Sequence, residues 1–278
     1  MEFEAYLQNS LPKAKSFHPH YEDSLGKMLL AGGKRFRPKL IFAVVEAYAP
    51  ELLENSFPVA LGYEMLHTYS LIHDDLPAMD DSDLRRGNPT LHKVYDEVTA
   101  ILAGDALNTE AFVQISSAPL RDDVKIALVK TLAENGGTRG MVLGQAIDCH
   151  FENTPLNIEQ LELLHKKKTG ALIASCLEAG AIICDFTYEE QKKIYDLGIK
   201  LGLLFQIQDD IIDATATEEE AGKPTGNDED KNTFTNLLGV QGAIERKNTI
   251  IEEIKEELEN YNQKFQDNLM ALVKKYLV

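Results

Sequence analysis

Apolar residues recur at helical spacing along the whole chain, and no segment keeps the sustained two-residue alternation of a half-exposed strand. The interruptions are short glycine- or proline-containing groups at residues 32–33, 77, 87–89 and 222–224. A chain of 278 residues, 44% of them hydrophobic, can bury a substantial core, and no stretch resembles a linker. The sequence therefore predicts an all-α fold in which residues 1–278 form a single large domain, with two domains as the weaker alternative.

Charge and composition exclude several classes of partner. The chain has 45 acidic and 28 basic residues, and the resulting charge of -17 disfavours binding to nucleic acid or to an anionic membrane. The most apolar stretch, residues 170–184, is interrupted by Glu178 and is too short to span a bilayer, so we expect a buried helix. Cys149, Cys176 and Cys184 show no CxxC spacing, and the acidic N-terminus has no signal-like or transit-like pattern. We expect a cytoplasmic protein without stable membrane association.

Two aspartate-rich clusters lie far apart in the sequence. The first consists of Asp74, Asp75 and Asp80, and the second of Asp209, Asp210 and Asp213. Mg²⁺ takes oxygen ligands and bridges readily to substrate phosphates, so carboxylates from two distant segments suggest a diphosphate held between metal ions. Both clusters are flanked by residues suited to phosphate recognition. Neither cluster alone would indicate a diphosphate site.

The second cluster lies on a predicted helix. At about 100° per residue, one stripe is formed by Ile194, Leu197, Leu201, Leu204, Gln208, Ile211 and Ile212. The adjacent arc carries Gln206, Asp209, Asp210 and Asp213. Asp209 and Asp213 are one turn apart and could share an ion, which would offset their repulsion. The alternative is an acidic helix face in water, but the apolar neighbours favour half-buried carboxylates.

The first cluster is predicted to begin on a helix and to end in a loop. One helix face carries His67, Ser70, Leu71 and Asp74. Pro77 disfavours helix just beyond, so Asp80 must arrive by an irregular turn. Arg85 and Arg86 follow, and their guanidinium groups can take phosphate oxygens in pairs. A loop of mutually neutralising charges is the alternative.

Two further basic segments complete the pattern. The sequence GGKRFRP at residues 32–38 places Lys34, Arg35 and Arg37 before an apolar helix that is expected to start near Pro38, which resembles an anion site at a helix entrance. Residues 166–168 are three lysines before the small-residue helix. Basic loops and lone helical histidines are usually solvated or structural, so these segments gain meaning from occurring together with the aspartates.

In this combination the chain resembles the bacterial short-chain polyprenyl diphosphate synthases, and among them most closely the farnesyl diphosphate synthases. The resemblance runs from about residue 32 to residue 239 and rests on ordered motifs. Besides the two aspartate motifs and the Arg85-Arg86 pair, they are GGKRFRP at 32–38, GMVLGQ at 140–145, KTGALI at 168–173, FQIQDD at 205–210 and GKPTG at 222–226. The resemblance implies the isoprenoid synthase fold, a helical bundle around a deep central cavity with the aspartate motifs facing each other across its mouth, and a homodimer.

The resemblance also implies residue roles. An allylic diphosphate would be held through three Mg²⁺ ions. Mn²⁺ is a possible substitute for Mg²⁺. The metal ligands would come from Asp74, Asp75, Asp80, Asp209, Asp210 and Asp213. Direct contacts to the allylic diphosphate would come from Arg85, Lys168, Thr169, Gln206 and Lys223. Isopentenyl diphosphate would be bound by Lys34, Arg37, His67 and Arg86. The catalytic set would be Asp74, Asp80, Arg85, Lys168 and Asp209.

The expected reaction follows from these residue types. Metals and basic groups that hold a departing diphosphate stabilise the transition state more than the substrate. The allylic diphosphate would ionise, and the isopentenyl double bond would attack the cation. The family resemblance implies that the proton lost afterwards passes to the departing diphosphate. We assign no side chain as nucleophile. A class I terpene cyclase is a weaker alternative because its second metal motif usually mixes Asn, Ser or Thr with Glu, and a non-catalytic subunit should have lost one of the motifs.

Product length depends on a steric floor near the first cluster. Tyr69 stands five residues before Asp74, where the resemblance implies an aromatic plug in farnesyl-forming enzymes, and the small Ser70 lies beside it. We expect the fifteen-carbon farnesyl product, with the twenty-carbon geranylgeranyl product as the alternative.

Overall fold

The computed structural model describes residues 2–215 and 232–277. Helices make up almost all of the regular structure in these residues, so the predicted all-α fold is confirmed. The chain divides into two compact units. Unit 1 consists of Met1–Pro38 and Leu53–Val129, and unit 2 of Lys39–Leu52 and Lys130–Val278. Two helices, α3 (Phe36–Tyr48) and α7 (Asp122–Gly136), contribute residues to both units.

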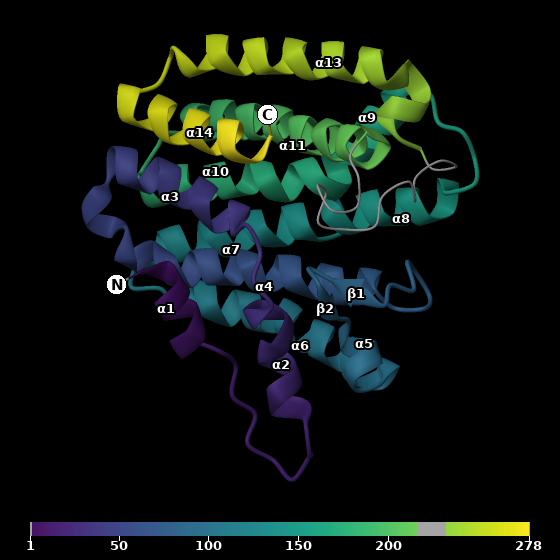
Figure 1. Ribbon diagram of the computed structural model, residues 1–278. Coiled ribbons are helices and arrows are strands. Elements are labelled where there is room, and N and C mark those ends of the chain that lie inside the picture. The colour runs from purple at the N-terminus through teal and green to yellow at the C-terminus, as the bar shows by residue number, and fades with distance from the viewer. Residues whose placement is uncertain (1, 216–231, 278) are drawn as a thin grey trace. The chain divides into compact units, whose positions relative to one another are not determined.

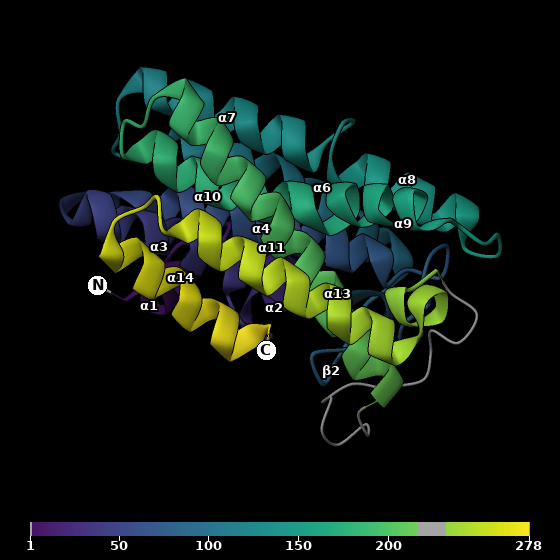
Figure 2. The ribbon, with the colours of Figure 1, turned by 90° about the horizontal axis from the view of Figure 1, so that it is seen from above.

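Unit 1 is built around one buried helix. This helix is α4 (Phe57–Asp74). Besides its parts of α3 and α7, unit 1 also contains α1 (Phe3–Asn9), α2 (Tyr21–Leu30), a 3-10 turn η2 (Glu54–Ser56), α5 (Leu91–Val94) and α6 (Glu97–Ser116). Helix α4 runs beside α6 (Figures 1 and 2). Gly62 permits this approach, because a methyl group there would lie 2.7 Å from the carbonyl oxygen of Ala111. The close packing fixes the helix that carries the first aspartate cluster at its end.

A small hairpin follows that cluster. Strands β1 (Leu84–Arg85) and β2 (Asn88–Pro89) pair in antiparallel fashion, with Arg85 opposite Asn88. The turn between them contains Arg86 and Gly87, both with positive φ (56° and 74°). The hairpin therefore presents Arg85 and Arg86 from a tight, defined turn rather than from an extended loop.

Unit 2 contains the remaining helices. They are the 3-10 turn η1 (Pro50–Leu52), α8 (Met141–Phe151), α9 (Ile158–His165), the π-helical turn η3 (Lys166–Gly170), α10 (Ala171–Ile183), α11 (Tyr188–Thr215), α13 (Phe234–Leu258) and α14 (Gln263–Tyr276). Helix α10 is buried along nearly its whole length, as its small apolar residues predicted. Helix α11 lies between α10 and α13 (Figure 2).

Glycines allow α11 to approach α10 closely. A methyl group at Gly198 would lie 2.4 Å from the Cα atom of Ala174, and one at Gly202 would lie 2.3 Å from the Cα atom of Gly170. These contacts set the position of the helix that carries the second aspartate cluster. Across the described residues, the helices are all too short or too polar to cross a lipid bilayer.

Candidate active site

The first aspartate cluster lies at the C-terminal end of α4. The helix ends at Asp74, three residues before Pro77, and the backbone N–H of Asp80 donates to the carbonyl oxygen of Asp74 at 2.9 Å. The chain thus folds back on the helix end by the irregular turn that the sequence predicted. Asp74 is half-buried and Asp80 is exposed. A helix C-terminus carries partial negative charge, so this end of α4 favours a bound cation.

Asp75 occupies a different environment from its neighbours. Its side chain is 1% exposed, and its Oδ1 atom accepts hydrogen bonds from Nε and Nη2 of Arg85 at 2.9 and 2.5 Å. Burial raises the pKa of Asp75, and Arg85 opposes that shift. Its Oδ2 atom is buried without a hydrogen-bond partner. Asp75 therefore ties the hairpin to the helix end, and a cation at the cluster could satisfy the remaining oxygen.

The basic loop contacts the hairpin through two glycines. Gly32 and Gly33 have φ values of 83° and 126°, which only glycine adopts readily. A methyl group at Gly33 would lie 2.6 Å from Cζ of Arg86, whose Nη1 atom donates to the carbonyl oxygen of Gly32 at 2.5 Å. The glycine pair thus lets the guanidinium of Arg86 lie against the loop that carries Lys34.

Positive groups from three segments surround His67. Burial and the charges of Arg37, Arg86, Arg85 and Arg35 hold the pKa of His67 well below its usual range. The imidazole is therefore neutral at pH 7 amid a concentration of guanidinium groups. Lys34 is exposed in the same loop. Arg37, His67 and Arg86, which the sequence assigned to one diphosphate, thus lie in one electropositive region of unit 1.

The second cluster lies near the C-terminal end of α11, where its three aspartates differ in surroundings. Asp210 is 2% exposed. Its Oδ1 atom accepts from Nε2 of Gln206 at 2.9 Å, and its Oδ2 atom accepts from the backbone N–H of Phe234 at 2.8 Å. Asp210 therefore fixes Gln206 and the start of α13. Asp209 is half-buried and Asp213 is 8% exposed, one helical turn further on.

The Lys-Thr-Gly segment adopts a π-helical turn, a form often found at functional sites. Within it, Nζ of Lys168 donates to Oδ2 of Asp148 at 2.5 Å, and the hydroxyl of Thr169 donates to Oε1 of Gln206 at 3.3 Å. Thr169, Gln206 and Asp210 thus form one hydrogen-bonded chain. Asp148 was not predicted from the sequence, since no spacing rule relates it to a lysine in another helical segment.

The packing of α8 fixes this π-helical turn. A methyl group at Gly144 would lie 2.1 Å from the backbone nitrogen of Lys168 and 2.4 Å from its Cα atom. Both contacts are with backbone, which cannot rotate away as a side chain can. The GMVLGQ motif therefore has a steric role, because its second glycine allows α8 to approach Lys168.

Gly144→Ala is expected to destabilise the protein by about 1–3 kcal/mol, the usual cost of overpacking. Urea denaturation followed by circular dichroism measures the change. Gly26→Ala is the matched control, because a methyl group there meets only the flexible side chain of Leu11, at 3.2 Å. Equal stability of the Gly144 variant and the wild type would contradict the steric role.

Tyr69 lies on α4 just before the first cluster. It is 8% exposed, and its ring packs edge-to-face on His73 with centroids 5.6 Å apart. Burial and the charge of Asp74 raise the pKa of Tyr69, so the phenol is neutral. His73 in turn fits against Gly104 of α6, where a methyl group would lie 2.2 Å from its Nε2 atom. The hydroxyl of Ser70 donates to the carbonyl oxygen of His67 at 2.8 Å and is thus satisfied within its own helix.

Lys223, also assigned to the diphosphate, lies outside the described residues. Within the described ranges, no three histidine, cysteine or acidic side chains are gathered into a ready-made metal site.

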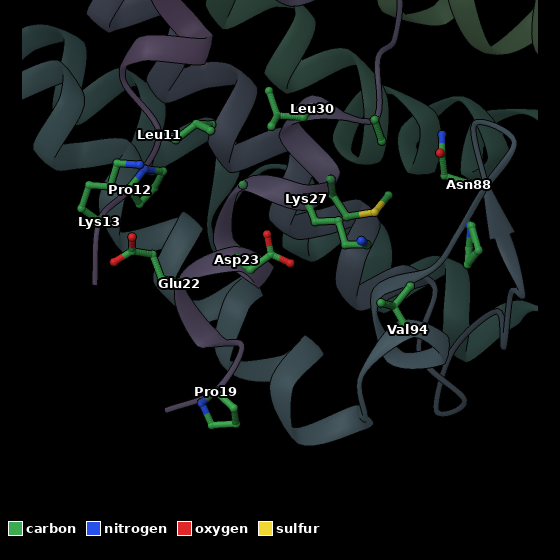
Figure 3. A pocket seen from close by; sticks show the side chains of 14 residues that line it. Leu11, Pro12, Lys13, Pro19, Glu22, Asp23, Lys27, Leu30, Asn88 and Val94 are labelled. Carbon is green, nitrogen blue, oxygen red and sulfur yellow. The ribbon is translucent and has the colours of Figure 1, made fainter. Parts of the chain in front are cut away.

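A cavity of about 750 Å³ lies elsewhere in unit 1, along the segment before α2, α2 itself and the residues around β2 and α5 (Figure 3). Its lining includes Lys27, Asp23, Asn88 and Val94 and none of the residues that the sequence assigned to substrate or metal. Nζ of Lys27 lies 5.7 Å from the centroid of the Tyr95 ring, and the hydroxyl of Tyr95 donates to Asp23. The cavity is therefore separate in composition from the candidate site.

Comparisons with known proteins show the family of this chain. Residues 18–274 match the Polyprenyl synthetase family. A farnesyl diphosphate synthase of Bacillus subtilis is 45% identical over 243 residues, which are 84% of this chain and 81% of that protein. A chloroplastic geranylgeranyl pyrophosphate synthase of Capsicum annuum is 42% identical over 260 residues, 91% of this chain and 70% of that protein.

The fold is shared with solved structures. A geranyltransferase from Helicobacter pylori, crystallised with magnesium and isoprenyl diphosphate, superposes with a TM-score of 0.92. It is 48% identical, and the match covers 98% of this chain and 93% of that one. The expected all-α isoprenoid synthase fold is thereby confirmed.

Proposed function

Since this chain belongs to the polyprenyl synthetase family and is a prenyltransferase, we propose that it condenses isopentenyl diphosphate with dimethylallyl diphosphate and then with geranyl diphosphate, making farnesyl diphosphate. The observation that carries the proposal is the composition of α4 and its neighbours in unit 1. One helix ends in Asp74 and, two turns earlier, carries a neutral His67 amid arginines. A carboxylate end for metal-bound diphosphate and a basic region for a second diphosphate are what the reaction requires.

The donor set fits Mg²⁺, which prefers carboxylate oxygens. Asp74, Asp80, Asp209 and Asp213 would provide ligands, and the unpaired Oδ2 of Asp75 supports a cation beside α4. Three ions are proposed from the family resemblance, with Mn²⁺ as a substitute. When bound, Mg²⁺ would neutralise the diphosphate and favour its departure. Asp210 would act by positioning Gln206, since both of its oxygens accept hydrogen bonds.

The basic and polar residues would hold the leaving group. Arg85, fixed by Asp75, and Lys168, fixed by Asp148, would donate to the diphosphate oxygens as negative charge develops there. Thr169 and Gln206 would add neutral donors, and Lys223 a further cation. Lys34, Arg37, His67 and Arg86 would bind isopentenyl diphosphate. A neutral imidazole can donate one hydrogen bond without adding charge, and the proton lost after condensation would leave with the diphosphate.

Lys34→Ala and Arg37→Ala are each expected to raise KM for isopentenyl diphosphate at least about tenfold, with a much smaller effect on KM for the allylic substrate, because each removes a cation from one diphosphate region only. Steady-state kinetics with each substrate varied in turn measures both constants. Arg139→Ala is the control, since its guanidinium is 75% exposed and pairs with Glu134. Equal effects on both substrates would show that the basic loop serves a different role.

We further propose that residues 1–278 form one catalytic domain and that two copies assemble into a homodimer in the cytoplasm. Support for a dimer comes from an exposed apolar face of unit 1. Its residues are Val98, Ile101, Leu102 and Val113, which are exposed and lie on one side of α6 by helical spacing. Contiguous exposed apolar surface favours a protein partner, and sedimentation velocity distinguishes a dimer from a monomer.

The activity test uses the purified protein and labelled isopentenyl diphosphate. Label should enter acid-labile products only when both an allylic diphosphate and a divalent cation are present, and EDTA should abolish incorporation until excess Mg²⁺ restores it. A terpene cyclase would instead consume allylic diphosphate without isopentenyl diphosphate, and a non-catalytic subunit would consume neither. Either result would overturn the proposal.

A further inference from the structure

Arg35 lies in the middle of the basic loop, yet its side chain points into the protein. It is 7% exposed. Its Nε and Nη2 atoms donate to the two carboxylate oxygens of Glu4 in α1, at 3.2 and 3.1 Å, and Nη2 also donates to the carbonyl oxygen of Leu29 at 2.7 Å. Nη1 donates to Oε1 of Glu64 in α4 at 2.9 Å. With its donors directed at these partners, Arg35 is a structural tie and not a ligand for diphosphate.

This tie determines the form of the loop. Arg35 has a φ of 48°, a left-handed conformation that a residue with a side chain adopts only when its surroundings enforce it. Its neighbour Lys34 is exposed, and Arg37 follows in the first turn of α3. The inward anchoring of Arg35 therefore defines how the residues on either side of it are presented.

Glu64 connects the loop to the other half of the basic region. It is 1% exposed and lies three residues before His67, on the same face of α4. Burial lowers the pKa of Arg86, and the charge of Glu64 is the strongest opposing influence, while Arg35 and Arg85 lower that pKa further. Glu64 is thus a buried counter-charge shared by Arg35, which it contacts, and by Arg86.

We propose that Glu64 is a positioning residue for the isopentenyl diphosphate region: through Arg35 it holds Lys34 and Arg37 in place relative to His67, and it offsets the charge of Arg86. This inference rests on the proposed function. Glu4 is the second anchor, which makes helix α1 part of the support of the region. Glu64 itself, being fully buried behind Arg35, contacts no substrate.

Glu64→Gln removes the charge and keeps the shape of the side chain. It is expected to raise KM for isopentenyl diphosphate about tenfold, while kcat and KM for the allylic substrate change less than about twofold. Glu64→Asp keeps the charge and should recover part of the loss. Glu178→Gln is the matched control, because this carboxylate also lies within an apolar helix of the core and accepts from Thr131 at 2.7 Å. It should leave both KM values unchanged even if it lowers stability.

Glu4→Gln provides a test if the Glu64 variants fail to fold, since Glu4 is 48% exposed. It should raise KM for isopentenyl diphosphate about threefold without changing that for the allylic substrate. The wild type is assayed in parallel, so that a failure of the proposed function can be distinguished from a failure of the positioning role. An inactive wild type would overturn the proposed function, whereas an active wild type with equal KM changes, or none, in a folded Glu64→Gln or in Glu4→Gln would overturn the positioning role alone.

Discussion

Asp74→Ala and Asp209→Ala are each expected to lower turnover by at least about 10²-fold while leaving the helical fold intact. The size of the effect is that of removing one preorganised electrostatic element from a site where charge develops. Neither residue is part of the apolar core, since both are half-buried at or near the end of a helix. Single-turnover and steady-state rates at saturating Mg²⁺ measure the loss, and circular dichroism checks the fold.

Asp123→Ala is the control for a general effect of lost negative charge, because Asp123 is exposed and pairs only with the exposed Arg121 among the described contacts. It should retain wild-type turnover. Near-normal turnover in Asp74→Ala or in Asp209→Ala would remove the basis for assigning the two aspartate clusters to metal-bound diphosphate.

Tyr69→Ala is expected to shift the main product from fifteen to twenty or more carbons. Each added five-carbon unit buries apolar surface worth roughly 4 kcal/mol, at about 0.8 kcal/mol per carbon, so growth continues until a side chain blocks it. Tyr69 is suited to that role because its ring is buried and held by His73, which in turn fits against Gly104. Chromatography of the dephosphorylated products measures the distribution.

Tyr69→Phe keeps the ring and removes only the hydroxyl, so it should keep the fifteen-carbon product. An active Tyr69→Ala enzyme with an unchanged product distribution would place the floor at another residue. The comparison between the two variants separates the volume of the ring from any hydrogen bond of the phenol.

The helices were predictable from the sequence where a local pattern determines them. The apolar stripe of α11 and the break before Pro77 both depend on neighbours within a few residues. Five members of that stripe are buried, namely Ile194, Leu197, Leu201, Leu204 and Ile211, and α4 ends at Asp74. The π-helical turn at residues 166–170 was not predicted, because the sequence there is a short run of lysines with no apolar pattern. Its backbone also packs against Gly144 of α8, a tertiary contact.

The different surroundings of the site aspartates also could not be predicted from the sequence. The family resemblance implied the same metal-binding role for Asp209 and Asp210, yet Asp210 accepts from the backbone N–H of Phe234, 24 residues further along. Asp75 likewise accepts from Arg85 across the turn that follows α4. Such partners are set by tertiary packing, and so is the inward direction of Arg35, whose sequence position among basic residues suggested no difference from Lys34.

Product analysis shows whether this prenyltransferase builds a fifteen-carbon diphosphate. The purified protein would be incubated with isopentenyl diphosphate, dimethylallyl diphosphate and Mg²⁺, and the products dephosphorylated and separated by chromatography. We expect farnesol as the main alcohol, with geraniol as a transient intermediate. A main product of twenty carbons, a cyclic hydrocarbon, or no product longer than the starting allylic alcohol would contradict it.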